Sequence, residues 1–181
     1  LSIMEDYERR FQKETEELLY QRVPAVLLVG IILIPFFSLL DYVVVREQFT
    51  LFFLYRIACS TSLLVLFLIY FTEFGRKRAY GLVTFAYIIA AFTISMMCVK
   101  MGGYPSFYYV GVIMVLVTVV ILPLNTFQTA MYGAMIYLIY AVPIVLFTSP
   151  TAESLKIFFS NSFFFVFFIV ITVLQSFEET R

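Results

Sequence analysis

The sequence predicts an all-α polytopic membrane protein, a six-helix transmembrane bundle with a cytoplasmic amphipathic N-terminal helix. Of the 181 residues, 62% are hydrophobic and only 13% are charged, whereas soluble domains average about 45–50% apolar and about 25% charged residues. The apolar residues also fall into runs close to the length of about 20 residues that crosses the hydrocarbon core. This composition excludes a water-soluble enzyme domain, a secreted disulfide scaffold and a disordered regulator.

Several kinds of chemistry are excluded by residues that the chain lacks. It has no His, which excludes His-ligated haem, His-containing zinc sites and His acid–base catalysis within this chain. Cys59 and Cys98 each lie inside an apolar run, where buried unreactive thiols are favoured over a disulfide or a metal pair. No nucleotide loop, nucleophile elbow or metal motif occurs, and twelve basic and twelve acidic residues cancel. We expect no catalytic residues, metal, cofactor or nucleic-acid partner.

The first element expected is an amphipathic helix over residues 1–22. Ser2 and Glu5 match the Ser-x-x-Glu capping box, and this charged segment is unlike a signal peptide. The helix either lies at the inner membrane interface or docks against a partner subunit or the cytoplasmic part of the protein. One side of it is kept apolar by Met4, Tyr7, Phe11 and Leu18.

Six membrane spans follow. The stretch 101–152 has no charge and is too long for one crossing. Leu122-Pro123-Leu124-Asn125-Thr126 divides it, because Pro restricts the residue before it and Asn favours a turn. The expected spans cover residues of about 23–45, 49–72, 79–99, 105–122, 127–147 and 157–177.

The distribution of Lys and Arg predicts the orientation. An even number of spans puts both ends of the chain on one side, and cytoplasmic loops carry the excess of Lys and Arg. Eight such residues lie on the side of the termini and three on the other. We therefore expect a multi-pass membrane protein with both termini in the cytoplasm. The eight are Arg9, Arg10, Lys13, Arg22, Arg76, Lys77, Arg78 and Arg181, against Arg46, Lys100 and Lys156.

Two ionisable residues lie within the expected spans. Asp41 is close to the end of the first span and Arg56 is about two turns into the second, and charges at membrane depth mark functional sites by default. The connecting hairpin is short enough for the two side chains to meet. They are interpreted as a structural ion pair that fixes the hairpin, with anion binding or snorkelling of Arg56 as alternatives.

The stretch Gly102–Gly111 is the most distinctive one. Two glycines and a proline favour a tight outer turn, and the tyrosines that follow enter the membrane at the depth that amphipathic rings prefer. They serve either as an interface anchor or as part of an outward-facing pocket. In the second case Ser106, Tyr108 and Tyr109 would offer hydroxyls to a small amphipathic or lipid ligand.

These features lead to a resemblance to a known family. The chain resembles the six-span N-terminal membrane domains of bacterial sensor histidine kinases and of related membrane-bound class III adenylate cyclases. Besides the charged N-terminal segment, the matching motifs are Leu40-Asp41-Tyr42, Arg56, Ser106-Phe107-Tyr108-Tyr109-Val110-Gly111 and Leu122-Pro123. In that family the hexapeptide often reads Ser-Pro-Tyr-Tyr-Ala-Gly, so Phe107 and Val110 depart from it.

The resemblance implies a membrane sensory or anchoring domain of a signal-transduction protein. A stimulus would pass through the sixth span and residues 178–181, which would start a cytoplasmic signalling helix, to a histidine kinase or nucleotide cyclase domain in the same chain. A homodimer in the bacterial inner membrane is expected. Asp41 and Arg56 would then serve structural coupling, and Ser106, Tyr108 and Tyr109 would serve sensing. Two alternatives remain, a purely structural dimerising membrane anchor and a small transporter or channel subunit.

Overall fold

The computed structural model describes residues 2–179 of the chain, with side chains for residues 17–177. Helices joined by short turns and loops make up this part, which contains no strand. The elements are α1 (Ser2–Phe36), α2 (Ser38–Val44), η1 (Arg46–Gln48), α3 (Phe49–Tyr70), α4 (Glu73–Lys77), α5 (Ala79–Lys100), α6 (Tyr109–Val117), η2 (Thr118–Ile121), α7 (Thr126–Phe147) and α8 (Ala152–Glu179).

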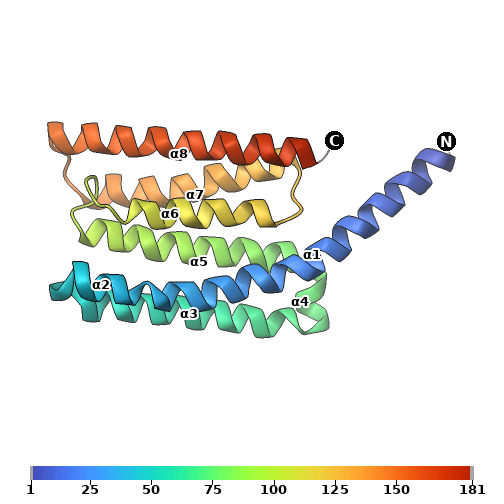
Figure 1. The fold of residues 1–181 in the computed structure, drawn as a ribbon, viewed down its shortest axis with the longest axis horizontal. Helices are drawn as coiled ribbons and strands as arrows, with labels where there is room; N and C mark the ends of the chain where they lie inside the picture. The colour runs from blue at the N-terminus through green and yellow to red at the C-terminus, as the bar shows by residue number, and fades with distance from the viewer. Residues whose placement is uncertain (1, 180–181) are drawn as a thin grey trace.

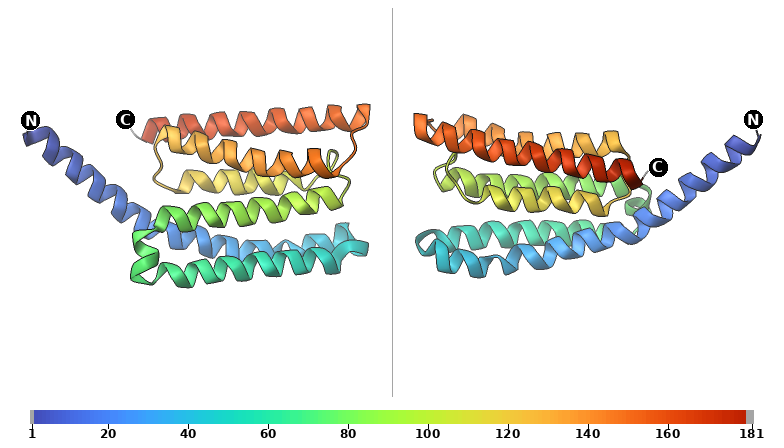
Figure 2. Two further views of the ribbon diagram at one scale, coloured as in Figure 1. Left: turned by 180° about the vertical axis from the view of Figure 1, so that it is seen from behind. Right: turned by 45° about the horizontal axis from the view of Figure 1, so that its top comes forward.

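The long helices run alongside one another in alternating directions (Figure 1). Helices α1 and α3 form one side of the bundle, α5 lies next to them, and α6, α7 and α8 form the other side, as the further views in Figure 2 also show. The start of α1 and the end of α8 lie at the same end, with α4 and the turn 122–125; we call it the terminal end. The opposite end, called the hairpin end, holds residues 37–48, 101–108 and 148–151.

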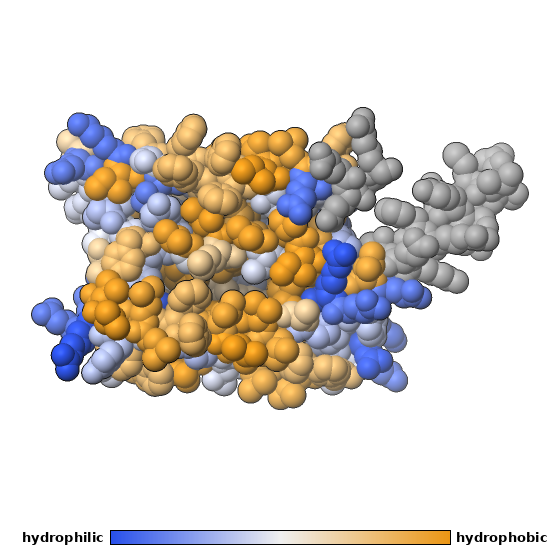
Figure 3. All heavy atoms as spheres, viewed as in Figure 1, coloured by the Kyte–Doolittle hydropathy of each residue, from blue (hydrophilic) through white to orange (hydrophobic). Residues whose placement is uncertain are grey.

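The surface between the two ends is apolar. Figure 3 shows hydrophobic residues along the length of the bundle and hydrophilic residues gathered at its ends. Large exposed side chains such as Leu146 and Phe163 contribute to this surface, which is far more apolar than a soluble monomer tolerates. Five helices are long and apolar enough to cross a membrane: Glu17–Val44, Arg46–Tyr70, Ala79–Lys100, Thr126–Phe147 and Ala152–Phe177. The protein is therefore a helical membrane bundle.

Helix α1 differs from the expected pair of elements. It continues from Ser2 to Phe36, so no boundary separates the expected segment 1–22 from the first span. The expected span 23–45 is instead interrupted at Phe37, after which α2 begins. The side chains of residues 1–16, with the expected capping box and most of the apolar stripe, lie outside the described part, as do residues 180–181.

Two prolines inside α1 leave backbone carbonyls without a helical partner, and side chains of α3 bond to them. Proline has no N–H to donate to the carbonyl four residues before it, so Pro24 and Pro35 leave the carbonyls of Tyr20 and Ile31 without their helical partners. The hydroxyl of Tyr70 donates to the Tyr20 carbonyl at 2.8 Å and that of Ser60 to the Ile31 carbonyl at 2.8 Å. Side chains of α3 thus complete the hydrogen bonding of α1.

The expected fourth span, 105–122, is not helical throughout. The helical segment Tyr109–Ile121 is shorter than a standard membrane crossing, and a loop precedes it. Gly102 and Gly103 adopt positive φ values of 91° and 70°, a conformation that glycine reaches without strain, and the Gly103 N–H donates to the carbonyl of Cys98 at 2.8 Å. This turn ends α5 and leads residues 104–108 back into the bundle.

Candidate functional site

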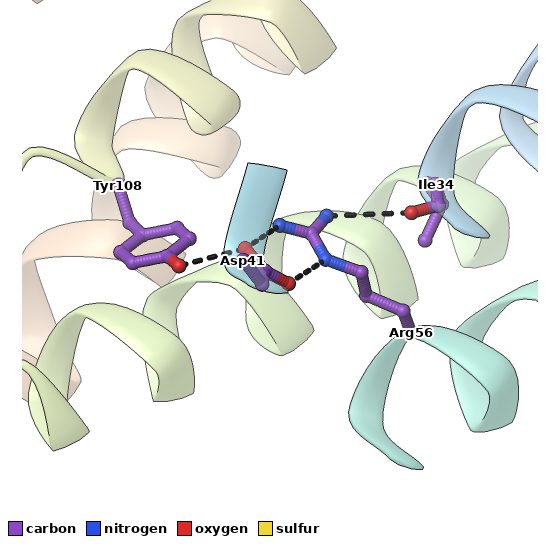
Figure 4. A network of polar contacts seen from close by, with 4 residues as sticks. All are labelled: Ile34, Asp41, Arg56 and Tyr108. Atoms are coloured by element: carbon purple, nitrogen blue, oxygen red, sulfur yellow. Dashed lines mark hydrogen bonds and ion pairs between the residues drawn. The ribbon is translucent and has the colours of Figure 1, made fainter. Parts of the chain in front are cut away.

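A buried ion pair joins α2 to α3 near the hairpin end. Asp41 is 0% exposed and Arg56 is 6% exposed. The Arg56 Nε donates to Asp41 Oδ2 at 2.5 Å and its Nη2 donates to Oδ1 at 2.9 Å, while Nη1 reaches the carbonyl of Ile34 at 3.4 Å (Figure 4). Two parallel bonds of this kind fix both the distance and the orientation of the two groups.

The interruption after α1 explains why Asp41 faces inward. Helix α2 restarts at Ser38, and the i, i+3 spacing puts Ser38 and Asp41 on one face, where both side chains are buried. The opposite face of α2 carries the exposed side chains of Leu39 and Val43. The amphipathic character of this short helix therefore points its carboxylate toward α3.

Tyr108 connects the ion pair to a third part of the chain. Its hydroxyl donates to Asp41 Oδ1 at 2.7 Å across 67 residues of sequence, so that Asp41 lies between Tyr108 and Arg56 in Figure 4. The Tyr108 ring is buried and meets Phe52 edge-on with centroids 5.3 Å apart. We call Asp41, Arg56 and Tyr108 the polar cluster.

Ser106 and Tyr109, the other two residues expected to sense a ligand, lie outside the polar cluster. Ser106 is buried, and its hydroxyl accepts the Tyr108 N–H at 3.3 Å. Tyr109 is half-buried at the start of α6. Neither side chain lines the cavity described below. Burial of Tyr104 and Tyr108 also differs from the interface-anchor interpretation, in which these rings would face the headgroups.

A cavity of about 790 Å³ lies beside the polar cluster, between α1, α5 and α6. Small residues form part of its wall: Gly30 on α1, Ala86 and Ala90 on α5, and Gly111 on α6 all line it. Its wall is almost entirely apolar. Polar side chains reach it at the hairpin end from Arg56 and Tyr108, and toward the terminal end from Tyr87 and Thr118.

Helix α8 also reaches the cavity. Phe168 is the residue of α8 that lines it, and Phe158 of the same helix meets the ring of Tyr104 in the 101–108 loop at 5.3 Å. The cavity and the loop that carries Tyr108 therefore both contact α8.

Among the described side chains, two hydrogen bonds cross from the α1–α2 segment to the α6 region, one at each end of the cavity. The first is the bond from Tyr108 to Asp41. The second, near the terminal end, runs from Arg22 Nη1 on α1 to the carbonyl of Ile121 at 3.0 Å. The adjoining turn 122–125 also accepts a bond from the Ser176 hydroxyl of α8 at the Leu124 carbonyl, at 2.8 Å.

Sequence reasoning missed the cavity and the residues Tyr87, Thr118 and Phe168 that line it. The signal lay in small residues on three helices, at Gly30, Ala90 and Gly111, and it becomes visible only once the helices are assembled. The two hydroxyls that α3 offers to α1 were also missed, although Pro24 and Pro35 identify the carbonyls that need a partner.

The remaining chemistry of the described side chains is limited. No group of three or more His, Cys, Asp or Glu residues able to hold a metal occurs among them, and Cys59 and Cys98 are buried and unpaired. Comparison with known proteins adds no relative: no family model, curated protein or solved structure matches the chain.

Proposed function

We propose that the chain is a membrane sensory and anchoring domain of a bacterial signal-transduction protein. The observation that carries the proposal is the meeting of three separate motifs. Asp41 of Leu40-Asp41-Tyr42, Arg56, and Tyr108 of the Ser106–Gly111 stretch form one hydrogen-bonded cluster. These are the motifs through which the sequence resembles the membrane domains of sensor histidine kinases and class III adenylate cyclases.

The signal passes from the cavity to α8. A stimulus that changes the spacing between α1 and α6 acts on Tyr108 at the hairpin end and on Phe168 of α8 directly. The contact of Tyr104 with Phe158 transmits a displacement of the loop to the same helix. Movement of α8 then biases two states of a cytoplasmic output domain, a histidine kinase or a nucleotide cyclase.

In this proposal the chain crosses the membrane six times, with the 104–108 loop and the segment Tyr109–Ile121 together forming the fourth crossing. Both termini are cytoplasmic and the protein resides in the inner membrane. The excess of Lys and Arg on the side of the termini supports this orientation. The output domain follows in the same chain and the protein works as a homodimer, as the resemblance implies.

The first experiment is to read the gene beyond Arg181. A dimerising helix followed by a kinase or cyclase domain supports the proposal, and a stop codon directly after Arg181 contradicts it. The second experiment replaces the membrane helices of the full-length protein with an unrelated dimeric anchor. Loss of regulation supports sensing, whereas unchanged regulation assigns the helices to anchoring alone.

A matched pair of variants tests the route through the polar cluster. In the full-length protein, Tyr108→Phe removes the bond to Asp41 and is expected to change the basal output activity by several-fold. Tyr109→Phe alters the neighbouring tyrosine, which lies outside the cluster, and is expected to leave it unchanged. Equal effects of the two variants on activity, at equal amounts of membrane-inserted protein, contradict the proposed route.

A further inference from the structure

The dimensions of the cavity fit one long hydrocarbon chain. Its volume of about 790 Å³ falls in the range of about 300–1,000 Å³ that is typical of ligand pockets. Along α1 and the start of α2 it extends from Val26 to Leu40, which at about 1.5 Å per residue is about 21 Å. That length exceeds one leaflet, about half of the roughly 30 Å hydrocarbon core.

The mouth of the cavity opens on the surface that faces lipid. Leu33 on α1 and Met114 and Val117 on α6 line the cavity and are also about half exposed. The surface of the bundle between its two ends is apolar (Figure 3). A ligand therefore enters sideways from the bilayer, with no polar barrier to cross.

The polar end of the cavity selects the head of the ligand. A guanidinium has five N–H groups, and three of those of Arg56 donate to Asp41 and to the carbonyl of Ile34. Arg56 lines the cavity, where a remaining N–H can donate to an acceptor.

Charge decides what kind of acceptor fits. Asp41 already neutralises Arg56 in a site that excludes water, so an anionic head would add an uncompensated charge in a low dielectric. A cationic head would meet the guanidinium itself. An uncharged carbonyl or hydroxyl accepts from the remaining N–H without either cost.

We propose that this cavity binds one single-chain amphiphile with an uncharged, hydrogen-bond-accepting head, drawn from the bilayer. The head lies against Arg56 and the chain runs along α1 toward Phe168 of α8. The binding itself is independent of the proposed signalling role. Its consequence, a shift of α8, rests on that role.

Tryptophan fluorescence tests the site directly, because the chain contains no Trp. Met114→Trp places a reporter at the cavity and Leu138→Trp places one at a similar depth on α7, on positions that are 50% and 56% exposed. Each variant of the 181-residue chain is reconstituted in phosphatidylcholine vesicles and titrated with a chain-brominated monoacylglycerol. We expect saturable quenching for Met114→Trp and only a weak linear response for Leu138→Trp. Linear responses in both overturn the site.

Competition by unbrominated amphiphiles of equal chain length tests the head. Monoacylglycerol is expected to reverse the quenching at a concentration about tenfold lower than the fatty-acid carboxylate or the alkyltrimethylammonium ion requires. A carboxylate that competes as well as the monoacylglycerol overturns the assignment of an uncharged head. Equal competition by all three reduces the site to a nonspecific apolar cleft and overturns the role of Arg56.

A filling variant separates binding from signalling. Val117→Phe intrudes into the cavity and Val142→Phe makes the same change on α7, outside it; both positions are 47% exposed. In the Met114→Trp background we expect Val117→Phe to weaken monoacylglycerol binding about tenfold and Val142→Phe to leave it unchanged. Equal binding by both variants overturns the proposal. Weakened binding with unchanged output in the full-length protein supports the site and contradicts only the proposed function.

Discussion

The two sides of α1 are held in different ways. Toward α3, hydrogen bonds join the helices at several heights, through Tyr70, Ser60 and the Arg56 bond to the Ile34 carbonyl. Toward α6, the same helix faces a cavity, and the polar ties to that region lie beyond the two ends of the cavity. In a bilayer, apolar burial does not drive helices together as it does in water, so close packing and hydrogen bonds decide which seams close. The spacing between α1 and α3 is therefore fixed, whereas the spacing between α1 and α6 can change. We call the first interface the fixed seam and the second the adjustable seam.

Removing the cation from the fixed seam is expected to have the largest effect. Arg56→Ala leaves the buried Asp41 carboxylate without its counter-ion, bonded only by the Tyr108 hydroxyl, and we expect a loss of about 3–5 kcal/mol in the free energy of unfolding. The loss is measured by following helical circular dichroism in micelles during denaturation. The double variant Asp41→Ala/Arg56→Ala should lose less than Arg56→Ala alone, because no unpaired charge remains. A loss below about 1 kcal/mol for the single variant would mean that water reaches this pair.

The second largest effect is expected from removing the α3 hydroxyls that bond to backbone carbonyls of α1. Ser60→Ala leaves the Ile31 carbonyl without a partner, and we expect a loss of about 1 kcal/mol in the free energy of unfolding. Ser62→Ala is the matched control, because that hydroxyl bonds only to the Ala58 carbonyl of its own helix, and it should change stability by less than about 0.5 kcal/mol. Equal losses in the same denaturation assay would show that the bond from Ser60 to α1 stabilises the protein no more than the bond of Ser62 within α3.

Tyr108→Phe acts on the adjustable seam, and its main effect is expected in hydrogen exchange and not in stability. Loss of the bond to Asp41 is expected to cost only about 0.5–1 kcal/mol of stability, but it frees the start of α6 from α2. Hydrogen exchange of the backbone amides should therefore become faster in α6 than in α3. Tyr109→Phe provides the control. Uniform acceleration in both helices would instead indicate general destabilisation.

The tie at the terminal end is expected to have the smallest effect. The bond from Arg22 to the Ile121 carbonyl is exposed, so Arg22→Gln should change the free energy of unfolding by less than about 0.5 kcal/mol. Amide exchange should increase only in residues 118–125, near the freed carbonyl. A loss as large as that of Ser60→Ala would place Arg22 in the fixed part of the molecule.

Hydropathy alone located most of the helices. The expected ranges 49–72, 79–99 and 127–147 agree with α3, α5 and α7 within two residues at each end, because a charge, a proline or a turn residue lies at each boundary. The range 105–122 failed in its first part, since an apolar run fixes the environment of a segment but does not require it to be helical. The expected boundary after residue 22 was wrong for another reason: α1 continues through Pro24, and the hydroxyl that replaces the lost helical bond, that of Tyr70, belongs to α3.

The candidate site was predictable in part. Asp41 and Arg56 were identified because charges are rare at membrane depth, and the short hairpin between them limits their separation. Tyr108 was identified within a group of three, but sequence gave no means of choosing it over Ser106 or Tyr109. Which of the three points toward Asp41 depends on the turn at Gly102 and Gly103, where two successive positive φ values redirect the chain.

Composition and pattern therefore determined the membrane class, the approximate helices and the charged ends, because each depends on local transfer free energies that add along the chain. Only the tertiary structure decided that Tyr108 meets Asp41, that Ser60 and Tyr70 complete α1, and that a cavity lies between α1 and α6. These features depend on contacts between distant segments and on the way in which three helices come together. No single segment carries that information.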